Sequence, residues 1–118
     1  MKKRKTNKLV GKIGWCSANT LGLDKGHYVF IRSVYGNKCS VNTFTSIKQK
    51  DGLYDLGKIK KIERGSLYPI PKKDSTLHRF SGIHKNVITN VPLDEVENIG
   101  RFFLKRRHHH YIQRHMRK

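Results

Sequence analysis

Acidic residues are scarce in this sequence. The 118 residues include 8 Asp and Glu against 26 Lys and Arg, which gives a formal net charge of +18. Repulsion among so many like charges disfavours a compact state, and a polyanionic partner is the simplest reason for a sequence to keep them. The charge therefore indicates a nucleic acid as the partner, with RNA favoured over DNA.

Long apolar segments are also missing. The basic residues 1–5 are not followed by the apolar stretch of a secretory signal, and no later segment is apolar over the length of a transmembrane helix. We therefore expect a cytoplasmic protein with no membrane partner.

Cysteine is rare, and the motifs of several enzyme classes are absent. Cys16 and Cys39 lie outside any Cys-x-x-Cys or Cys/His pattern, which indicates reduced core residues rather than a zinc site. The sequence has no phosphate-binding glycine loop, HExxH motif or nucleophile elbow. Three of the eight acids cluster near residues 94–97, whereas a Mg²⁺ nuclease needs several convergent carboxylates. We expect no metal and no cofactor, so any cleavage of nucleic acid would be metal-independent.

The apolar residues that are present suffice for one small domain. They make up 36% of the sequence, which supports a modest core. We predict a flexible basic arm at residues 1–8, one domain at residues 9–104, and a solvated basic extension at residues 105–118, helical or frayed.

The clearest local pattern predicts a β-hairpin. Residues 27–35 and 38–45 have the composition of strands, and the Gly-Asn pair at 36–37 suits a two-residue turn with positive φ. We also predict further strands at residues 9–16, 67–70 and 83–91, and a short edge strand or turn-bounded extension at residues 58–65. Residues 17–26 and 48–57 are predicted loops.

The hairpin register decides which polar side chains share a face. Without a bulge, His27 pairs with Ser46, so His27 and Thr45 point to opposite faces unless a bulge near Asn42 corrects the register. The same register puts Arg32 on the face of Thr45.

One helix is predicted after the last strand. Pro92 and the acids that follow it suit a helix start, and the apolar spacing continues over residues 93–104, with a bend at Gly100. The fold class is therefore mainly β with α: a small antiparallel β-barrel or strongly curved sheet plus a C-terminal helix.

Basic residues throughout the chain are candidates for phosphate contact, although each alone is more often a solvated surface charge. Those that we predict to contact nucleic acid are Lys48, Lys72, Lys73, Arg79, Lys85, Lys105, Arg106 and Arg107. Tyr68 lies near two of these lysines and is a candidate for base stacking, though a core role is the more common one for such a residue. Residues 108–110 are three consecutive histidines, and we interpret them as a source of pH-dependent positive charge.

The order of segments over residues 9–104 resembles the MazF/PemK/Kid family of toxin endoribonucleases. The motifs that carry the resemblance are VGKIGW at 10–15, GHYVFI at 26–31, VNTFTS at 41–46 and VITNVPLD at 87–94. The resemblance implies a small SH3-like β-barrel that cleaves RNA by attack of the 2′-hydroxyl on the neighbouring phosphate. It also implies a neutralising antitoxin, for which an acidic protein or a structured RNA suits the charge, and leaves a homodimer open.

The resemblance also suggests the site residues. Thr45 matches the family's threonine, and His27 stands where the family has an arginine. His27 and His84 are candidate acid and base, since histidine is the usual choice near neutral pH, although each alone is more often structural. Thr45, Ser46 and Arg32 are candidate phosphate contacts, and Arg32 is the alternative catalytic cation.

Two other functions stay open at this point. The same basic surface suits a non-catalytic RNA- or DNA-binding module. A structural protein of a ribonucleoprotein, whose basic ends thread into RNA, would have a similar composition.

Overall fold

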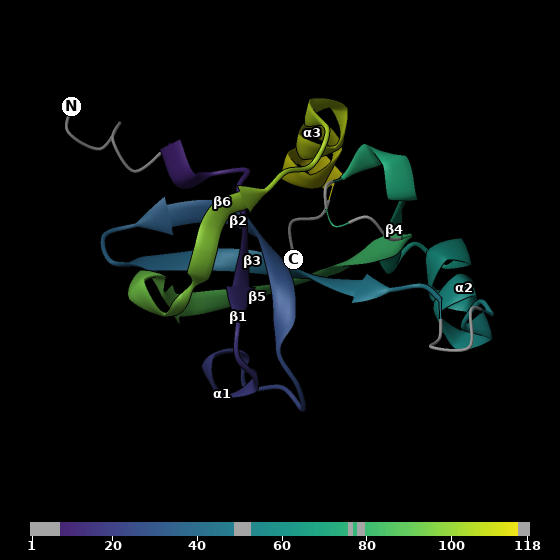
Figure 1. The fold of residues 1–118 in the computed structure, drawn as a ribbon, viewed down its shortest axis with the longest axis horizontal. Helices are drawn as coiled ribbons and strands as arrows, with labels where there is room; N and C mark the ends of the chain where they lie inside the picture. Colours follow the sequence, from purple (N-terminus) through teal and green to yellow (C-terminus); the bar gives the residue numbers. More distant parts are fainter. Residues whose placement is uncertain (1–7, 49–52, 76, 78–79, 116–118) are drawn as a thin grey trace.

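The computed structural model describes residues 8–48, 53–75, 77 and 80–115. Within this part of the chain, six strands form one antiparallel sheet in the order β4-β5-β3-β2-β1-β6 (Figure 1). The strands are β1 (Ile13–Cys16), β2 (His27–Tyr35), β3 (Lys38–Ser46), β4 (Leu67–Ile70), β5 (Ser81–Pro92) and β6 (Glu97–Phe102). The antiparallel sheet is as predicted, but the described end strands β4 and β6 do not pair with each other, so the sheet is open and not closed into a barrel.

The predicted hairpin of β2 and β3 and its two-residue turn are confirmed, but the register differs from the predicted one. Gly36 has φ of 65°, the positive value that the two-residue turn requires. The pairs run from Tyr35↔Lys38 to Val29↔Thr43, but the register shifts between Ile31 and Ser33. The bulge therefore lies at Arg32 in β2 and not near Asn42 in β3.

This bulge changes which residues share a face of the sheet. Phe30 pairs with Asn42 and Ile31 pairs with Val41, so Phe30 and Val41 lie on opposite faces. A core cluster covers each face. The cluster on the Phe30 face contains Ile13, Phe30, Phe44, Ile70, Leu77, Ile83, Leu104 and Ile112. The cluster on the Val41 face contains Cys16, Leu21, Val29, Ile31, Cys39, Val41, Val91 and Val96.

The prediction of a helix at residues 93–104 is wrong. A short 3₁₀ turn at Leu93–Glu95 leads into β6, which pairs with the outer edge of β1. Asn98 and Gly100 have φ of 56° and 85°, values that an α-helix excludes. The two residues thus interrupt any helix, and the edge of β1 supplies the hydrogen-bond partners that make this segment a strand.

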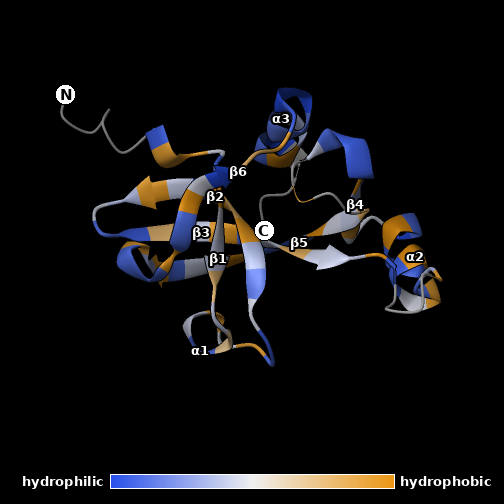
Figure 2. Ribbon diagram, in the orientation of Figure 1, coloured by the Kyte–Doolittle hydropathy of each residue, from blue (hydrophilic) through white to orange (hydrophobic). Residues whose placement is uncertain are grey.

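The C-terminal helix is α3 (Arg106–His115), within the segment that the sequence suggested was a solvated extension. Ile112 is fully buried in the core cluster of the Phe30 face, and His108 is 6% exposed. Figure 1 shows α3 against the sheet, and Figure 2 shows that its residues are mostly hydrophilic. The helix is thus part of the domain, because it contributes buried side chains to the core.

Two other helices replace predicted loops and a strand. Residues 58–65 were predicted as an edge strand, but α2 (Leu56–Glu63) occupies most of this segment. Asp55 caps α2, since its carboxylate accepts hydrogen bonds from the backbone N–H of Gly57 and Lys58. The short α1 (Ala18–Leu21) lies in the predicted loop at 17–26 and is capped by Ser17.

Candidate functional site

A cleft opens where β2 and β3 separate. Their last pair is Val29↔Thr43. Beyond it β2 continues alongside β1, with His27 opposite Cys16, while β3 continues alongside β5, with Thr45 opposite Gly82. The diverging strands are visible in Figure 1. They leave a cleft of about 630 Å³.

The cleft brings together four residues that the sequence singled out: His27, Thr45, Ser46 and Lys48. The other lining residues come from β1, the loop before β2, β2 and β3 themselves, α2 with its N-cap, and the chain around β5. They are Trp15, Lys25, Gly26, Tyr28, Phe44, Asp55, Lys58, Leu77 and Ser81.

His27 is oriented by the backbone of the opposite strand. Its Nδ1 lies 2.9 Å from the carbonyl oxygen of Phe44. A carbonyl oxygen only accepts hydrogen bonds, so Nδ1 carries the proton and donates it. In the neutral ring Nε2 then has the lone pair, and the ring is set up to take a proton at that atom.

His84 lies next to the cleft but does not line it. Burial, and then electrostatic interaction with Lys61, His27 and Lys58, lowers the pKa of His84, which favours its neutral ring. His84 therefore interacts electrostatically with His27, although the structure does not place both imidazoles on the cleft wall.

An irregular stretch of β5 positions His84. From Asn42 to Phe44 β3 advances by two residues, while its partner β5 advances by four, from Ile83 to Val87. The side-chain N–H₂ of the buried Asn42 donates to the backbone oxygens of His84 and Lys85, at 3.0 and 3.4 Å. Asn42 thus gives hydrogen bonds to carbonyl groups that the bulge takes out of the hydrogen-bond pattern between β3 and β5.

The cleft is positively charged. Lys25, Lys48 and Lys58 line it, and Asp55 is the one acidic side chain among its described lining residues. Asp55 is 3.9 Å from Lys58, whose Nζ also donates to the backbone oxygen of Ser46 at 2.8 Å. Lys48 lies 5.5 Å from the centre of the Tyr54 ring. The cleft is suited to an anionic group such as phosphate.

Aromatic rings form the wall of the cleft beside His27. Trp15 and Tyr28 meet edge to face with ring centres 5.1 Å apart, and both are partly exposed. Gly26 permits this packing, because a Cβ there would lie 2.5 Å from Cζ2 of Trp15 and 2.9 Å from the backbone oxygen of Cys16. Such rings beside cations suit the stacking of nucleobases.

Arg32 lies away from the cleft, against the C-terminal end of α3. Its guanidinium donates to the backbone oxygens of Ile112 and Gln113 at 2.8 and 3.2 Å. It therefore satisfies carbonyls at the C-terminal end of α3, where a cation is favourable. Arg32 is not among the residues that line the cleft.

The remaining predicted contacts are spread over other surfaces. Lys72, Lys73 and Lys105 line a second hollow, of about 360 Å³, beside the buried Asp74. Arg107 pairs with Asp74 at 2.8 Å, and Arg106 is exposed at the start of α3. Lys85 lines a third hollow, of about 320 Å³. Arg79 and most of the predicted basic arm lie outside the described residues.

The two thiols do not contribute to this site. Cys16 and Cys39 are free and buried as expected, and burial raises their pKa to about 12 and about 11. Thiols that stay protonated are poor nucleophiles. In the described part of the chain, no three His, Cys, Asp or Glu side chains converge as metal ligands. None of its helices has the length and apolarity of a membrane span.

Lys25, Lys58, Trp15 and Tyr28 were not predicted as site residues. Trp15 and Tyr28 stand in the motifs that carry the family resemblance, and Asp55 before an apolar i, i+3 pattern was a signal for the helix that supplies Lys58. For Lys25 the sequence contains no comparable signal.

The fold and site define an antiparallel β-sheet protein with a basic, aromatic-walled cleft between two separating strands. Comparisons with protein-family models, with curated proteins and with solved structures find no match to this chain. The resemblance to the toxin endoribonucleases therefore stays a prediction from sequence.

Proposed function

We propose that this protein is a metal-independent endoribonuclease that binds and cleaves RNA in the cleft between β2 and β3. The observation that carries the proposal is the orientation of His27, whose Nδ1–H is committed to the Phe44 carbonyl in a cleft that also contains Thr45 and three lysines. A fixed imidazole among cations supplies a base and charge stabilisation together.

The proposed reaction needs only these groups, the RNA and water. Nε2 of His27 takes the proton of a 2′-hydroxyl, and the 2′-oxygen attacks the adjacent phosphorus. The bond between phosphorus and the 5′-oxygen breaks, the leaving oxygen takes a proton from water, and His27 releases its proton to water. The products are a 2′,3′-cyclic phosphate and a 5′-hydroxyl. The lysines stabilise the additional negative charge that develops on the phosphate oxygens.

The test uses long RNA in excess EDTA, with analysis of the fragment ends. The informative variant is His27→Asn, because the Asn amide N–H₂ can keep the bond to the Phe44 carbonyl while the titratable nitrogen is lost. We expect the cleavage rate to fall by about 10²- to 10⁴-fold, the usual value of one positioned acid or base, with RNA affinity unchanged.

Two controls separate catalysis from folding and from contamination. Wild-type protein should leave the 2′-deoxy analogue of the RNA intact, since the nucleophile is missing. Arg32→Ala should lower stability without lowering the rate of the folded fraction. If wild type binds RNA but releases no cyclic-phosphate ends, the cleavage proposal is overturned and the protein is a binding module.

A further inference from the structure

The hollow of about 320 Å³ lies at the other end of α2 from the cleft. It is lined by residues of α2, β4, β5 and α3 and of the turn after α2, namely Ile62, Gly65, Leu67, Tyr68, Pro69, Lys85 and Tyr111. None of these lining residues is acidic. The hollow therefore combines apolar and aromatic walls with one cation, Lys85.

Two parallel tyrosine rings stand in this hollow. The rings of Tyr68 and Tyr111 are stacked, with centres 4.2 Å apart and an interplanar angle of 13°. Tyr68 is partly buried, and Tyr111 is 41% exposed. A stacked pair that stays accessible presents a flat aromatic surface to a third planar ring.

A buried chain of hydrogen bonds holds Tyr68 in position. His108 lies with Nε2 2.8 Å from a carboxylate oxygen of Asp74 and with Nδ1 2.7 Å from the Tyr68 hydroxyl. The carboxylate only accepts, so in the neutral ring Nε2–H donates to Asp74 and Nδ1 accepts from Tyr68. Burial raises the pKa of Tyr68, which keeps the phenol protonated as a donor. The tyrosine pair is thus pre-organised, which reduces the entropy that a ligand must lose on binding.

We propose that this hollow is a binding subsite for one unpaired nucleobase of an RNA strand, stacked against the Tyr68–Tyr111 pair, with Lys85 contacting the phosphate. The inference rests on RNA as the partner in the proposed function and extends it to a second site. Every base has a π-face, so such a site favours single strands without selecting a sequence.

The helix between the two sites sets their spacing. Asp55 and Lys58 at the start of α2 line the cleft, and Ile62 and Gly65 at its end line the hollow. At 1.5 Å per residue the eight residues of α2 span about 12 Å. Stacked nucleotides advance by about 3.4 Å each, so the base in the hollow lies about three to four nucleotides from the phosphate in the cleft. Lys61 and Arg64, in α2 and directly after it, are exposed.

The test measures binding of fluorescently labelled single-stranded octanucleotide and dinucleotide RNA by anisotropy. We expect Tyr111→Ala to weaken octanucleotide binding by about 5- to 100-fold, as loss of one stacked base does, while Tyr111→Phe binds like wild type. Dinucleotide binding should not change. Tyr35→Ala is the matched control, because Tyr35 is 45% exposed and pairs with Lys38 beside the end of β5, whereas β4 and the hollow lie at the start of β5.

Cleavage assays separate this proposal from the proposed function. If wild type cleaves and Tyr111→Ala binds and cleaves the octanucleotide like wild type, the subsite is overturned and the endoribonuclease stands. If wild type cleaves nothing but Tyr111→Ala still loses octanucleotide binding, the subsite stands without the enzyme. Absence of RNA binding by wild type overturns both. Lys85→Gln, an exposed change on β5, supplies a second variant should Tyr111→Ala fail to fold, and it should weaken octanucleotide binding alone.

Discussion

At the scale of single residues, Asp74 is the buried acid around which basic side chains of the C-terminal segment gather. Arg107 and His108 each lie 2.8 Å from one carboxylate oxygen, and Lys105 lies 3.6 Å from the other. Hydrogen bonds from His108 and Arg107 hold the pKa of Asp74 well below its usual range. The carboxylate is therefore stabilised in its charged form, and it ties α3 to the chain after β4.

We predict that Asp74→Asn lowers the free energy of unfolding at pH 7. The pKa of Asp74 is depressed in the folded state, so its contribution is present above the unfolded value of 3.8 and is lost as the pH falls below it. The difference between wild type and Asp74→Asn should accordingly shrink from about pH 4 downward. Urea unfolding at a series of pH values measures it, and a difference that does not depend on pH would contradict the ion-pair account.

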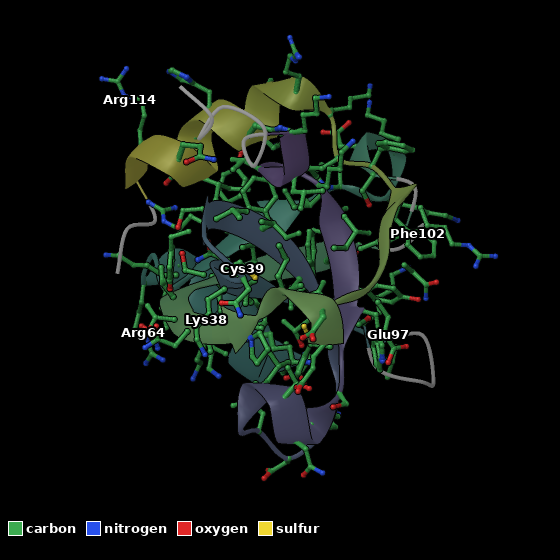
Figure 3. All side chains as sticks on the ribbon, turned by 90° about the vertical axis from the view of Figure 1, so that its left-hand side faces the viewer. Lys38, Cys39, Arg64, Glu97, Phe102 and Arg114 are labelled. Atoms are coloured by element: carbon green, nitrogen blue, oxygen red, sulfur yellow. The ribbon has the colours of Figure 1, made fainter. Side chains whose placement is uncertain are left out.

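At the scale of elements, α3 shows how little apolar surface a helix needs to join a core. Ile112 is fully buried in the core cluster, while His110 on the same helix is exposed to solvent. Figure 3 shows the side chain of Arg114 pointing away from the body of the protein. The helix therefore has one buried side and one basic, solvated side.

We predict that Ile112→Ala destabilises the protein by about 2–5 kcal/mol, the usual cost of truncating a fully buried aliphatic side chain. His110→Ala, two residues away on the exposed side, should change the stability by less than about 0.5 kcal/mol. Chemical denaturation of both variants checks the contrast. Equal stabilities would mean that α3 is the solvated extension that the sequence suggested.

Strands β1 to β5 could be predicted from the sequence because their signals are local. β-branched and aromatic residues on both sides of the Gly-Asn pair at 36–37 identify the hairpin without reference to the rest of the fold. The open edge of β1 is not visible locally, and that edge converts residues 97–102 from an expected helix into β6. In α3 the buried residues are Ile112 and His108, and the residues around them have the composition of a solvated tail.

The site, too, depends on both local sequence signals and long-range contacts. Thr45 and His27 were found through motifs, but an unbroken register would have put them on opposite faces. The bulge at Arg32 corrects this, and it forms where the Arg32 side chain reaches the end of α3, a contact between residues 80 apart in sequence. Lys25 and Lys58 reach the cleft only because the loop before β2 and the helix α2 fold against it.

At the scale of the whole molecule, the positive charge is distributed over several surfaces. Cations line the cleft, the hollow beside Asp74 and the tyrosine hollow, and they continue along α2 and the outer side of α3. Such a distribution favours a long polyanion over a small anionic ligand, because a strand can contact several of these surfaces at once.

We predict that RNA affinity falls steeply with salt concentration, because a chain with a net charge of +18 should displace several counterions from the strand. With about six phosphate contacts, the slope of log K against log salt on single-stranded RNA is about −4. Lys25→Gln, in the cleft, should make this slope shallower by about 0.7. Lys38→Gln is the matched control, because Lys38 is exposed at the hairpin turn, at the other end of β3 from Thr45 and Ser46 of the cleft. Binding measured from low to moderate salt gives the slopes. A wild-type slope near zero, or equal losses in the two variants, would show that this charge does not bind RNA through the cleft.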